Sequence, residues 1–258
     1  MTEKRASEIM EKTVINGSPH PNTLEYMDAL AISIDVLGTD YTREQLKNWI
    51  LVNKYPFLLP KYWNAESMVY EADKDYDYTW TELDAMPDGW RKAFGEMMCE
   101  EIKEELIKHN CLDEYLILDI KEKFGILRWH DNGTPIGCNV SQIIDKYSVL
   151  SENICLICGK PDVPMTGTLP SYISPLCKSC YCTPIDYVKG DMTDAELKRF
   201  CDDHERDWEE WAEEKSKMSD TYSVRRWVKD KDDFETMEYD ISETANKIRA
   251  KWRVRYGE

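Results

Sequence analysis

Two Cys-x-x-Cys pairs are the part of this chain whose residue types and spacing could do chemistry. Cys155 and Cys158 form the first pair, and Cys177 and Cys180 follow after an interval long enough to fold back. Two such pairs have the ligand spacing of a structural zinc site, and Gly159 suits the positive φ that such a turn often needs. We therefore predict a structural zinc ion, because four thiolates fill a tetrahedral shell and leave no position for a catalytic water.

Three alternatives remain open for these cysteines. One pair alone could act as a redox Cys-x-x-Cys motif, although two matched pairs make a metal shell the simpler interpretation. Cys182 could replace Cys180 as the fourth ligand, against the preferred spacing of two residues. Many zinc modules contact nucleic acid, but this one carries Lys160 and Lys178 without a basic cluster, which favours a role in stabilising the fold.

The remaining cysteines and the histidines form no comparable pattern. Nine cysteines in the chain, an odd number, suit a reducing cytoplasm better than a disulfide framework. His130 follows Trp129 at a predicted strand end, beside Asp131, and is the one histidine considered for acid–base chemistry. An ordinary surface position is the simpler interpretation. The chain has no Gly-x-Ser-x-Gly elbow, Walker loop or Gly-x-Gly-x-x-Gly motif, and no catalytic residue is predicted.

An acidic segment before the helix predicted from residue 90 resembles part of a calcium loop. Asp73, Asp75 and Asp77 alternate as at the start of an EF-hand. Tyr78 stands where that loop needs glycine for its sharp turn, and no flanking helices are evident. The pattern therefore favours a solvated loop or strand edge over a calcium site.

Composition limits the classes of function. The 258 residues carry a net charge of −17 with 42% hydrophobic and 11% aromatic residues, which is typical of a folded domain. Such a surface repels nucleic acid, so we expect no direct nucleic-acid binding by the chain as a whole. It would attract a basic partner, but a charge that only keeps the protein soluble is the simpler interpretation. The N-terminus does not resemble a signal peptide, and no apolar run approaches the ~20 residues that span a bilayer. We expect a cytoplasmic protein with no membrane contact.

The periodicity of apolar residues and the turn signals predict an α+β fold that is mainly helical, with a small β-hairpin region and a four-cysteine module of the zinc-ribbon or treble-clef kind. Helices are expected over residues 3–12, 23–37, 42–51, 90–109, 141–151, 193–218 and 242–255, and strands over 115–120, 124–129 and 222–229. The helices over 23–37 and 42–51, each with an apolar stripe, should form an antiparallel pair. Capping boxes are expected at Thr42 with Gln45 and at Thr193 with Glu196. Asp88 is expected to cap the start of the helix over 90–109, and Asn110 to end it. Four parts are expected along the chain: an N-terminal helical region 1–60, a central core 61–152, the zinc module 153–184, and an acidic helix with a C-terminal arm 185–258.

The predicted helix after the cysteines is crowded with carboxylates. Its tryptophans lie three residues apart on one face, where they could dock into a basic, partly apolar groove of another protein. Packing of this face on the protein's own core, with the acids outward, is the ordinary alternative. The residues predicted to bind a partner are Asp207, Trp208, Glu210, Trp211 and Glu214.

Several motifs in the middle of the chain occur in a recognisable order. Asp88-Gly89-Trp90 opens a helix, Ile120-Lys-Glu-Lys-Phe-Gly-Ile-Leu-Arg128 follows, and Ser174-Pro-Leu-Cys177 leads into the second cysteine pair. Over roughly residues 80–182 the chain resembles a widespread family of bacterial and phage proteins of unknown function that place a four-cysteine zinc module after a Lys-Glu-Lys-Phe-Gly-x-Leu-Arg strand. The resemblance implies a zinc site and a phage or prophage origin, and implies no activity.

Three hypotheses of function follow. The leading one is a non-enzymatic, protein-binding factor of phage or mobile-element origin in a bacterial host cell, with an acidic inhibitor of a basic host defence nuclease as its specific version. The second is a metal-dependent hydrolase or nuclease whose carboxylates converge near His130 only in the folded chain. The third is a zinc-dependent nucleic-acid module that uses the locally basic final helix, which carries Lys247, Arg249, Lys251, Arg253 and Arg255.

Overall fold

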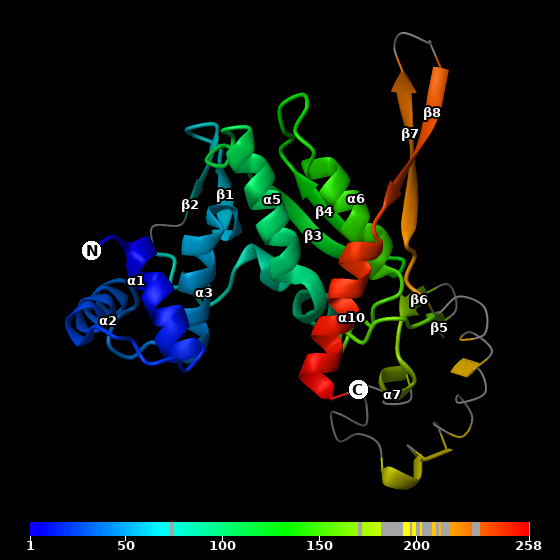
Figure 1. Cartoon of the computed structure of the whole chain (residues 1–258), viewed down its shortest axis with the longest axis horizontal. Coiled ribbons are helices and arrows are strands. Elements are labelled where there is room, and N and C mark those ends of the chain that lie inside the picture. The colour runs from blue at the N-terminus through cyan, green and yellow to red at the C-terminus, as the bar shows by residue number, and fades with distance from the viewer. Residues whose placement is uncertain are drawn as a thin grey trace. The chain divides into compact units, whose positions relative to one another are not determined.

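The computed structural model describes residues 1–72, 75–169, 172–181, 193–196, 198–199, 202, 208–209, 212, 217–228 and 233–257. These residues have the α+β architecture expected from the sequence, in which helices alternate with small sheets that each pair two consecutive strands (Figure 1). The chain divides into two compact units. The first unit contains Met1–Ala85, Lys103–Leu118 and His130–Cys138, and the second contains Met86–Ile102, Asp119–Trp129 and Asn139–Glu258. The contiguous four-part division remains a prediction.

Three helices begin the first unit. They are α1 (Glu3–Met10), which continues into the π-helical turn η1 (Glu11–Ile15), α2 (Thr23–Leu37) and α3 (Arg43–Lys54). The short N-terminal helix α1 packs against both α2 and α3. The two helices that were expected to pair, α2 and α3, therefore belong to an arrangement of three helices. Its core consists of Ala6, Ile9, Met10, Ala29, Leu46, Trp49 and Ile50.

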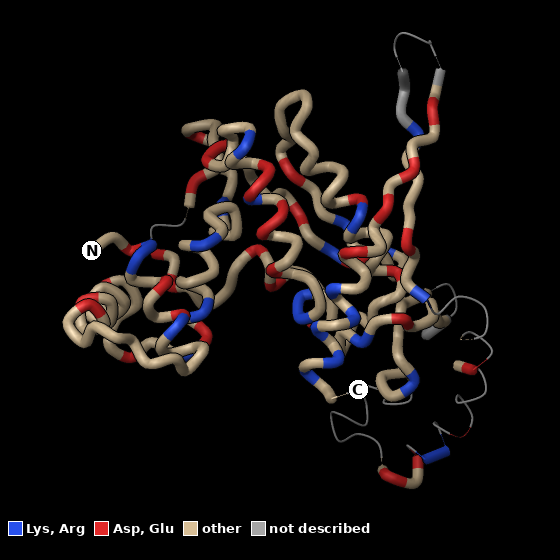
Figure 2. The backbone as a smooth tube through the Cα atoms, in the orientation of Figure 1, with Lys and Arg blue, Asp and Glu red and all other residues tan. Residues whose placement is uncertain are grey.

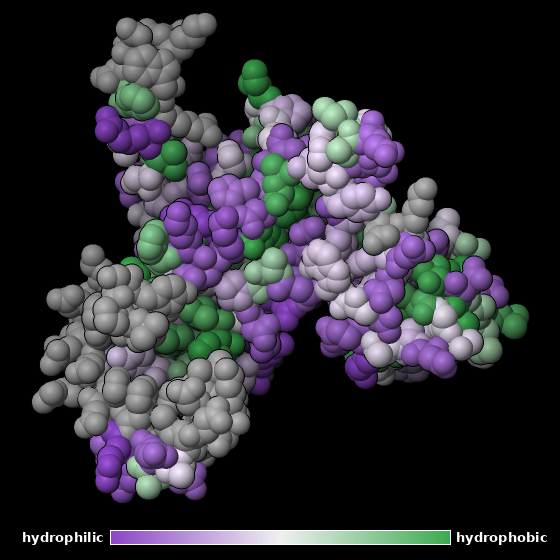
Figure 3. Space-filling view, turned by 180° about the vertical axis from the view of Figure 1, so that it is seen from behind, coloured by the Kyte–Doolittle hydropathy of each residue, from purple (hydrophilic) through white to green (hydrophobic). Residues whose placement is uncertain are grey.

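The apolar stripe predicted along α2 is only partly covered. Leu24 and Met27, at its N-terminal end, are 78% and 53% exposed, whereas Ala29 is fully buried. Figure 3 shows hydrophobic surface between polar residues over these N-terminal helices. Helical periodicity therefore located the helix correctly but did not determine how much of its stripe finds a packing partner.

Two capping boxes predicted from the sequence are confirmed. At α3, Gln45 N–H donates to Thr42 Oγ1 at 3.1 Å, and Gln45 Oε1 accepts from Thr42 N–H at 2.9 Å. After the cysteines, Thr193 N–H donates to Glu196 Oε2 at 2.9 Å, and Glu196 N–H donates to Thr193 Oγ1 at 3.3 Å. Each box satisfies N–H groups that a helix start leaves without an intrahelical partner. The rest of the helix expected over 193–218 falls largely outside the described residues.

A hairpin that the sequence did not predict follows the first three helices. Strands β1 (Lys61–Asn64) and β2 (Val69–Ala72) pair antiparallel, and Asn64 Oδ1 accepts from the N–H groups of Glu66 and Ser67 to form the turn. Asparagine stabilises turns in this way because its side chain replaces a backbone acceptor. Single turns of 3₁₀ helix flank the hairpin at η2 (Pro56–Leu58) and η3 (Glu82–Ala85).

The helix predicted over 90–109 is present with a different start. It runs through α4 (Asp88–Trp90), the π-helical turn η4 (Arg91–Gly95) and α5 (Glu96–Lys108). The expectation that Asp88 caps this helix is wrong, because Asp88 is its first helical residue and its carboxylate pairs with Arg91 at 2.7 Å. At the other end Asn110 has a φ of 53°, so it terminates the helix in the left-handed conformation, as expected from the sequence.

Strands β3 (Ile117–Lys123) and β4 (Ile126–Asp131) form a hairpin. Phe124 and Gly125 form its two-residue turn, with φ values of 55° and 76°. Two positive φ angles match the twist of the strands, and glycine takes such an angle at little cost. Lys121–Lys123 was expected to form the connection and Phe124 to begin the second strand, so the predicted turn lies about two residues too early.

Helix α6 (Val140–Ser151) is fastened to β4 within the second unit. Ser151 Oγ accepts from Leu127 N–H at 2.9 Å, and Ser148 Oγ donates to Leu127 carbonyl at 3.0 Å. Tyr147 stacks on Phe94 with ring centroids 5.2 Å apart. These contacts fix the C-terminal end of α6, from which the chain enters the first cysteine pair.

The C-terminal part of the second unit adds a long hairpin and a helix. Strands β7 (Thr221–Val228) and β8 (Asp233–Asp240) pair antiparallel, and α10 (Ser242–Tyr256) follows. The strand expected over 222–229 and the final helix are confirmed, whereas β8 was not predicted. Tyr222 OH donates to Gln142 carbonyl at 3.0 Å, which ties the hairpin to α6.

An ion pair joins α10 to the segment between the cysteine pairs. Arg249 Nε and Nη2 donate to the two carboxylate oxygens of Asp162 at 2.8 and 2.9 Å, and Met218 N–H donates to the same carboxylate at 2.9 Å. Burial raises the pKa of Asp162, but these hydrogen bonds outweigh it and hold the pKa below its usual value. A depressed pKa makes the pair stabilising at neutral pH and ineffective below that pKa.

Asp162→Asn is therefore expected to lower the free energy of unfolding at pH 7 by about 1–2 kcal/mol, since the pair is partly exposed and screened. The difference from wild type should persist above pH ~4 and vanish as the pH falls through the folded-state pKa of Asp162. Chemical denaturation of both proteins at a series of pH values measures this difference in the free energy of unfolding. Glu44→Gln, which breaks the exposed pair with Lys47, is the control and should cost about 0.3 kcal/mol. A difference between Asp162→Asn and wild type that does not change down to pH ~2 would contradict this assignment.

Candidate metal centre

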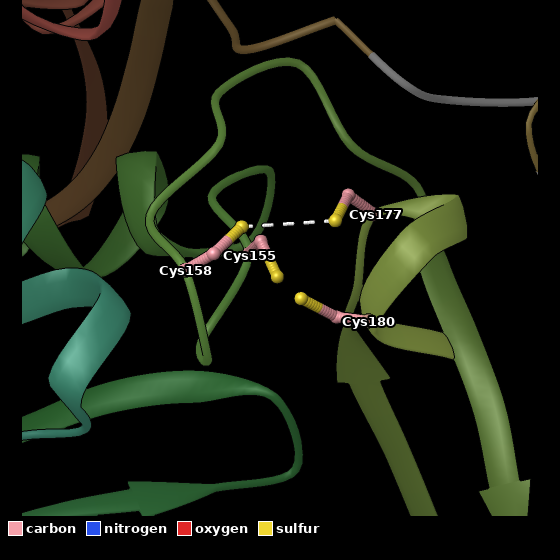
Figure 4. A group of neighbouring side chains, drawn as sticks. All are labelled: Cys155, Cys158, Cys177 and Cys180. Atoms are coloured by element: carbon pink, nitrogen blue, oxygen red, sulfur yellow. Dashed lines mark hydrogen bonds between the residues drawn. The ribbon is translucent and has the colours of Figure 1, made fainter. Parts of the chain in front are cut away.

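The four predicted cysteines lie together in the second unit. Cys155, Cys158, Cys177 and Cys180 point toward one another, and all four sulfurs lie within 4.8 Å of one another (Figure 4). The sulfurs of Cys158 and Cys177 are 3.7 Å apart. Four sulfurs placed tetrahedrally about 2.3 Å from one ion would be separated by about 3.8 Å, so this group has the size of a metal shell.

The first pair lies in a tight turn closed by backbone hydrogen bonds. Cys155 N–H donates to Lys160 carbonyl at 2.8 Å, and Gly159 N–H donates to Cys155 carbonyl at 2.9 Å. Gly159 has a φ of 87°, which confirms the reason for expecting glycine there. The turn directs both thiols of the pair to the same side.

The second pair is delivered by a hairpin and a short helix. Strands β5 (Met165–Leu169) and β6 (Tyr172–Pro175) return the chain, and α7 (Lys178–Tyr181) begins just after Cys177. Leu156 N–H, inside the first turn, donates to Pro175 carbonyl at 3.0 Å. This bond sets the two cysteine pairs opposite each other independently of any ion.

The electrostatics of the group favour a cation. Hydrogen bonds from the other three thiols lower the pKa of Cys155, whereas hydrogen bonding to Cys155 and Cys158 raises the pKa of Cys177 and of Cys180. Burial also opposes ionisation of every member. Neighbouring thiolates repel one another, so only a divalent cation allows all four to ionise together.

The start of the long helix packs directly on the first turn. Gly89 N–H donates to Leu156 carbonyl at 2.8 Å, and the Trp90 indole N–H donates to Ile154 carbonyl at 2.8 Å. A Cβ atom at Gly89 would lie 2.1 Å from the carbonyl oxygen of Cys155. The Asp88-Gly89-Trp90 motif is recognisable in the sequence, but its contact with the cysteines was not predicted.

The residues predicted to bind a partner are only partly described. Trp208 is half-buried, and its indole N–H donates to Leu176 carbonyl at 3.0 Å, next to the second cysteine pair. Glu209 pairs with Lys178 at 3.1 Å. Asp207, Glu210, Trp211, Glu214 and the alternative ligand Cys182 lie outside the described residues. The role of this segment in binding stays a prediction.

The two weaker site candidates acquire no further support. His130 is exposed on β4 and belongs to neither group of metal-ligating side chains found in the described part of the chain. In the acidic loop, Asp77 accepts hydrogen bonds from the N–H and the hydroxyl of Thr79 at 3.1 and 2.7 Å, while Asp73 is not described. Tyr78 takes a φ of 60° in place of the glycine of a calcium loop.

A second group of ligating side chains was not predicted from the sequence. Glu105, His109 and Cys138, all in the first unit, bring an oxygen, a nitrogen and a sulfur within 4.8 Å of one another. The Glu-x-x-x-His spacing on a predicted helix was visible in the sequence. Nothing in the sequence indicated that Cys138 lies against that helix.

Among the described residues, no helix combines the length and the apolar character needed to cross a membrane. Comparisons of the chain with protein-family models, curated proteins and solved structures found no match.

Proposed function

We propose that the four cysteines bind a structural zinc ion and that the protein is a non-enzymatic, protein-binding factor. The observation that carries the proposal is the convergence of four thiols at tetrahedral spacing, with both pairs positioned by backbone hydrogen bonds. A complete thiolate shell suits zinc and leaves no position for substrate or catalytic water. The order of tight turn, hairpin and short helix supports a treble-clef-like module over a zinc ribbon.

The proposed partner is a protein with a basic surface. The net charge of −17 supports this choice, and Figure 2 shows acidic residues along α5 and in many other parts of the chain. The acidic segment predicted to bind begins close to the cysteines in sequence, and its described residues Trp208 and Glu209 contact residues next to the second cysteine pair. A metal ion would thus stabilise the base of this segment. Following the resemblance to phage proteins, we propose a basic host defence nuclease as the target.

The test reverses charge at the proposed interface. Tagged wild-type protein is used to capture partners from a bacterial host lysate, with washes at low and high salt, and the partner is identified by mass spectrometry. The triple variant Asp207→Lys, Glu210→Lys, Glu214→Lys is expected to bind that partner at least about tenfold more weakly, because charge complementarity drives the association. Wild-type binding should also weaken as salt increases.

A matched variant distinguishes local recognition from net charge. Asp28→Lys, Asp35→Lys, Glu66→Lys reverses three exposed acids in the first unit, and we expect it to bind like wild type. Equal loss in both variants would indicate a non-specific charge effect. Undiminished binding by the interface variant would exclude the proposed segment.

One observation favours a second candidate, nucleic-acid binding by the module. Lys92, Lys251 and Arg255 line a cavity of about 10 Å³ together with Cys158 and Gly159, at the basic end of α10 visible in Figure 2. Desolvation lowers the pKa of Lys251, Glu96 opposes that shift, and Arg255 adds to it. Cations crowded in this way attract phosphate.

The same capture experiment separates the two candidates. If the washed chain retains nucleic acid instead of a protein, and Lys251→Gln with Arg255→Gln releases it, the second candidate replaces the first. Arg249 is excluded from this test because its guanidinium is already held by Asp162.

A further inference from the structure

Three side chains of different chemistry converge at the C-terminal end of α5. Glu105 and His109 are one helical turn apart and so share a face of the helix. His109 Nε2 lies 3.1 Å from Glu105 Oε1, and both residues place a ligand atom within 4.8 Å of the sulfur of Cys138. Carboxylate oxygen, imidazole nitrogen and thiolate sulfur are the three ligand types that zinc accepts in proteins.

The helix end is held in the conformation that presents these ligands. Asn110 adopts a left-handed conformation, and Cys111 N–H donates back to Leu106 carbonyl at 3.0 Å. The thiol of Cys111 is buried close to Cys138: burial raises the pKa of Cys111, and the neighbouring Cys138 adds to the shift. A second sulfur therefore lies close to that of Cys138.

The loop that carries Cys138 is anchored in the same unit. Asn132 Oδ1 accepts from Leu116 N–H at 2.9 Å, and its Nδ2 donates to Glu114 carbonyl at 2.8 Å. Tyr115 OH donates to Asp131 at 2.9 Å. These bonds hold the segment after β4 against the chain that leaves α5. They therefore help to keep Cys138 close to Glu105 and His109.

Burying these polar side chains costs free energy unless an ion or a hydrogen-bond partner satisfies them. The side chains of Glu105 and His109 are 13% and 25% exposed. Nε2 of His109 is closed off from solvent and has no hydrogen-bond partner of suitable geometry, even though a carboxylate oxygen is close. Buried polar atoms of folded proteins are nearly always satisfied, and a metal ion would satisfy this nitrogen.

We propose that Glu105, His109 and Cys138 bind a second divalent transition-metal ion, for which Zn²⁺ is the best match. Three protein ligands leave the fourth position to water or an exogenous ligand, in contrast to the closed shell of the four cysteines. The site belongs to the first unit and does not depend on the function proposed for the chain. The competing interpretation is a simple ion pair between protonated His109 and Glu105, which assigns no role to Cys138.

The experiment counts metal ions per chain. The full-length protein is dialysed to equilibrium against buffered Zn²⁺ under reducing conditions, and zinc is measured by elemental mass spectrometry. Wild type is expected to bind two equivalents, and His109→Asn and Cys138→Ser are each expected to bind one. His130→Asn, an exposed histidine of the same unit, should retain two. Cys158→Ser should lose the other equivalent, and the double variant with His109→Asn should lose both.

Cobalt absorption provides a second measurement. With Co²⁺ in place of zinc, free imidazole is expected to perturb the visible bands of wild type and of Cys158→Ser, because the proposed site has an open position, and to leave those of His109→Asn unchanged. Thermal unfolding of each variant confirms that it is folded. A single zinc equivalent in wild type, eliminated entirely by Cys158→Ser, would overturn the proposal, as would two equivalents in both His109→Asn and Cys138→Ser.

Discussion

Cys158→Ser is expected to abolish tight metal binding at the four-cysteine site and to destabilise the second unit strongly. A ligand present at about 1,000 times its dissociation constant stabilises the state that binds it by about 4 kcal/mol, and structural zinc sites bind more tightly still. For a unit of this size, a loss of about 4 kcal/mol corresponds to about 8–16 °C in the melting temperature. Serine preserves the shape of cysteine but is a far poorer zinc ligand.

The measurement is thermal unfolding by circular dichroism, with and without a strong chelator. Chelation should lower the melting temperature of wild type far more than that of Cys158→Ser, because the variant has already lost the ion of the four-cysteine site and keeps only the ion proposed for the first unit. Cys99→Ala removes a buried thiol outside the group and should keep the response of wild type to the chelator. If Cys158→Ser melts like wild type and responds to the chelator as wild type does, the site does not hold a stabilising ion.

Gly89→Ala should be nearly as damaging, although alanine normally favours a helix. Besides the 2.1 Å approach to Cys155 carbonyl, the added carbon would lie 2.6 Å from the carbonyl carbon of Leu156 and 2.7 Å from Gly159 nitrogen. All three contacts are with backbone, which cannot move aside as a flexible side chain can. We expect a loss of about 3 kcal/mol, at the upper end of the usual cost of overpacking, and weaker zinc retention because the first cysteine turn is displaced.

Gly133→Ala is the matched control. Gly133 has a φ of 87°, and no heavy atom lies within 4 Å of the place that a Cβ would take, so its substitution costs only backbone strain of about 1 kcal/mol. Urea denaturation measures the loss of stability in each variant, and zinc-release kinetics measure how tightly each variant retains zinc. Faster zinc release in Gly89→Ala, but not in Gly133→Ala, is the expected outcome. Indistinguishable behaviour would show that the packing between helix and turn is not important for the metal site.

The features predicted correctly from sequence are those encoded over short distances. The Cys-x-x-Cys pairs, the Thr42 and Thr193 capping boxes and the glycine after Cys158 each depend on residues within a few positions of one another. Local side-chain chemistry decides such features whatever the rest of the fold does. The correct predictions therefore extend to the convergence of the four cysteines.

The features that were missed depend on tertiary contacts. Strand β8 is rich in acidic residues, which do not favour a strand, and its pairing with β7 is what holds it in this conformation. The role of Gly89 becomes visible only when the turn at Cys155 lies against it, and Cys138 reaches His109 only through the loop anchored by Asn132. No period or spacing in one sequence contains that information.

The alternation of the two units along the chain bears on how the protein is made. The first unit takes its last segment, His130–Cys138, only after the second unit has contributed Met86–Ile102 and Asp119–Trp129. A chain emerging from the ribosome therefore cannot complete the two units by folding them one after the other. Removing residues 1–85 would leave Lys103–Leu118 without most of its unit, so neither unit can be obtained by truncation at a single linker. Gene fusion or domain exchange must accordingly keep the two units together.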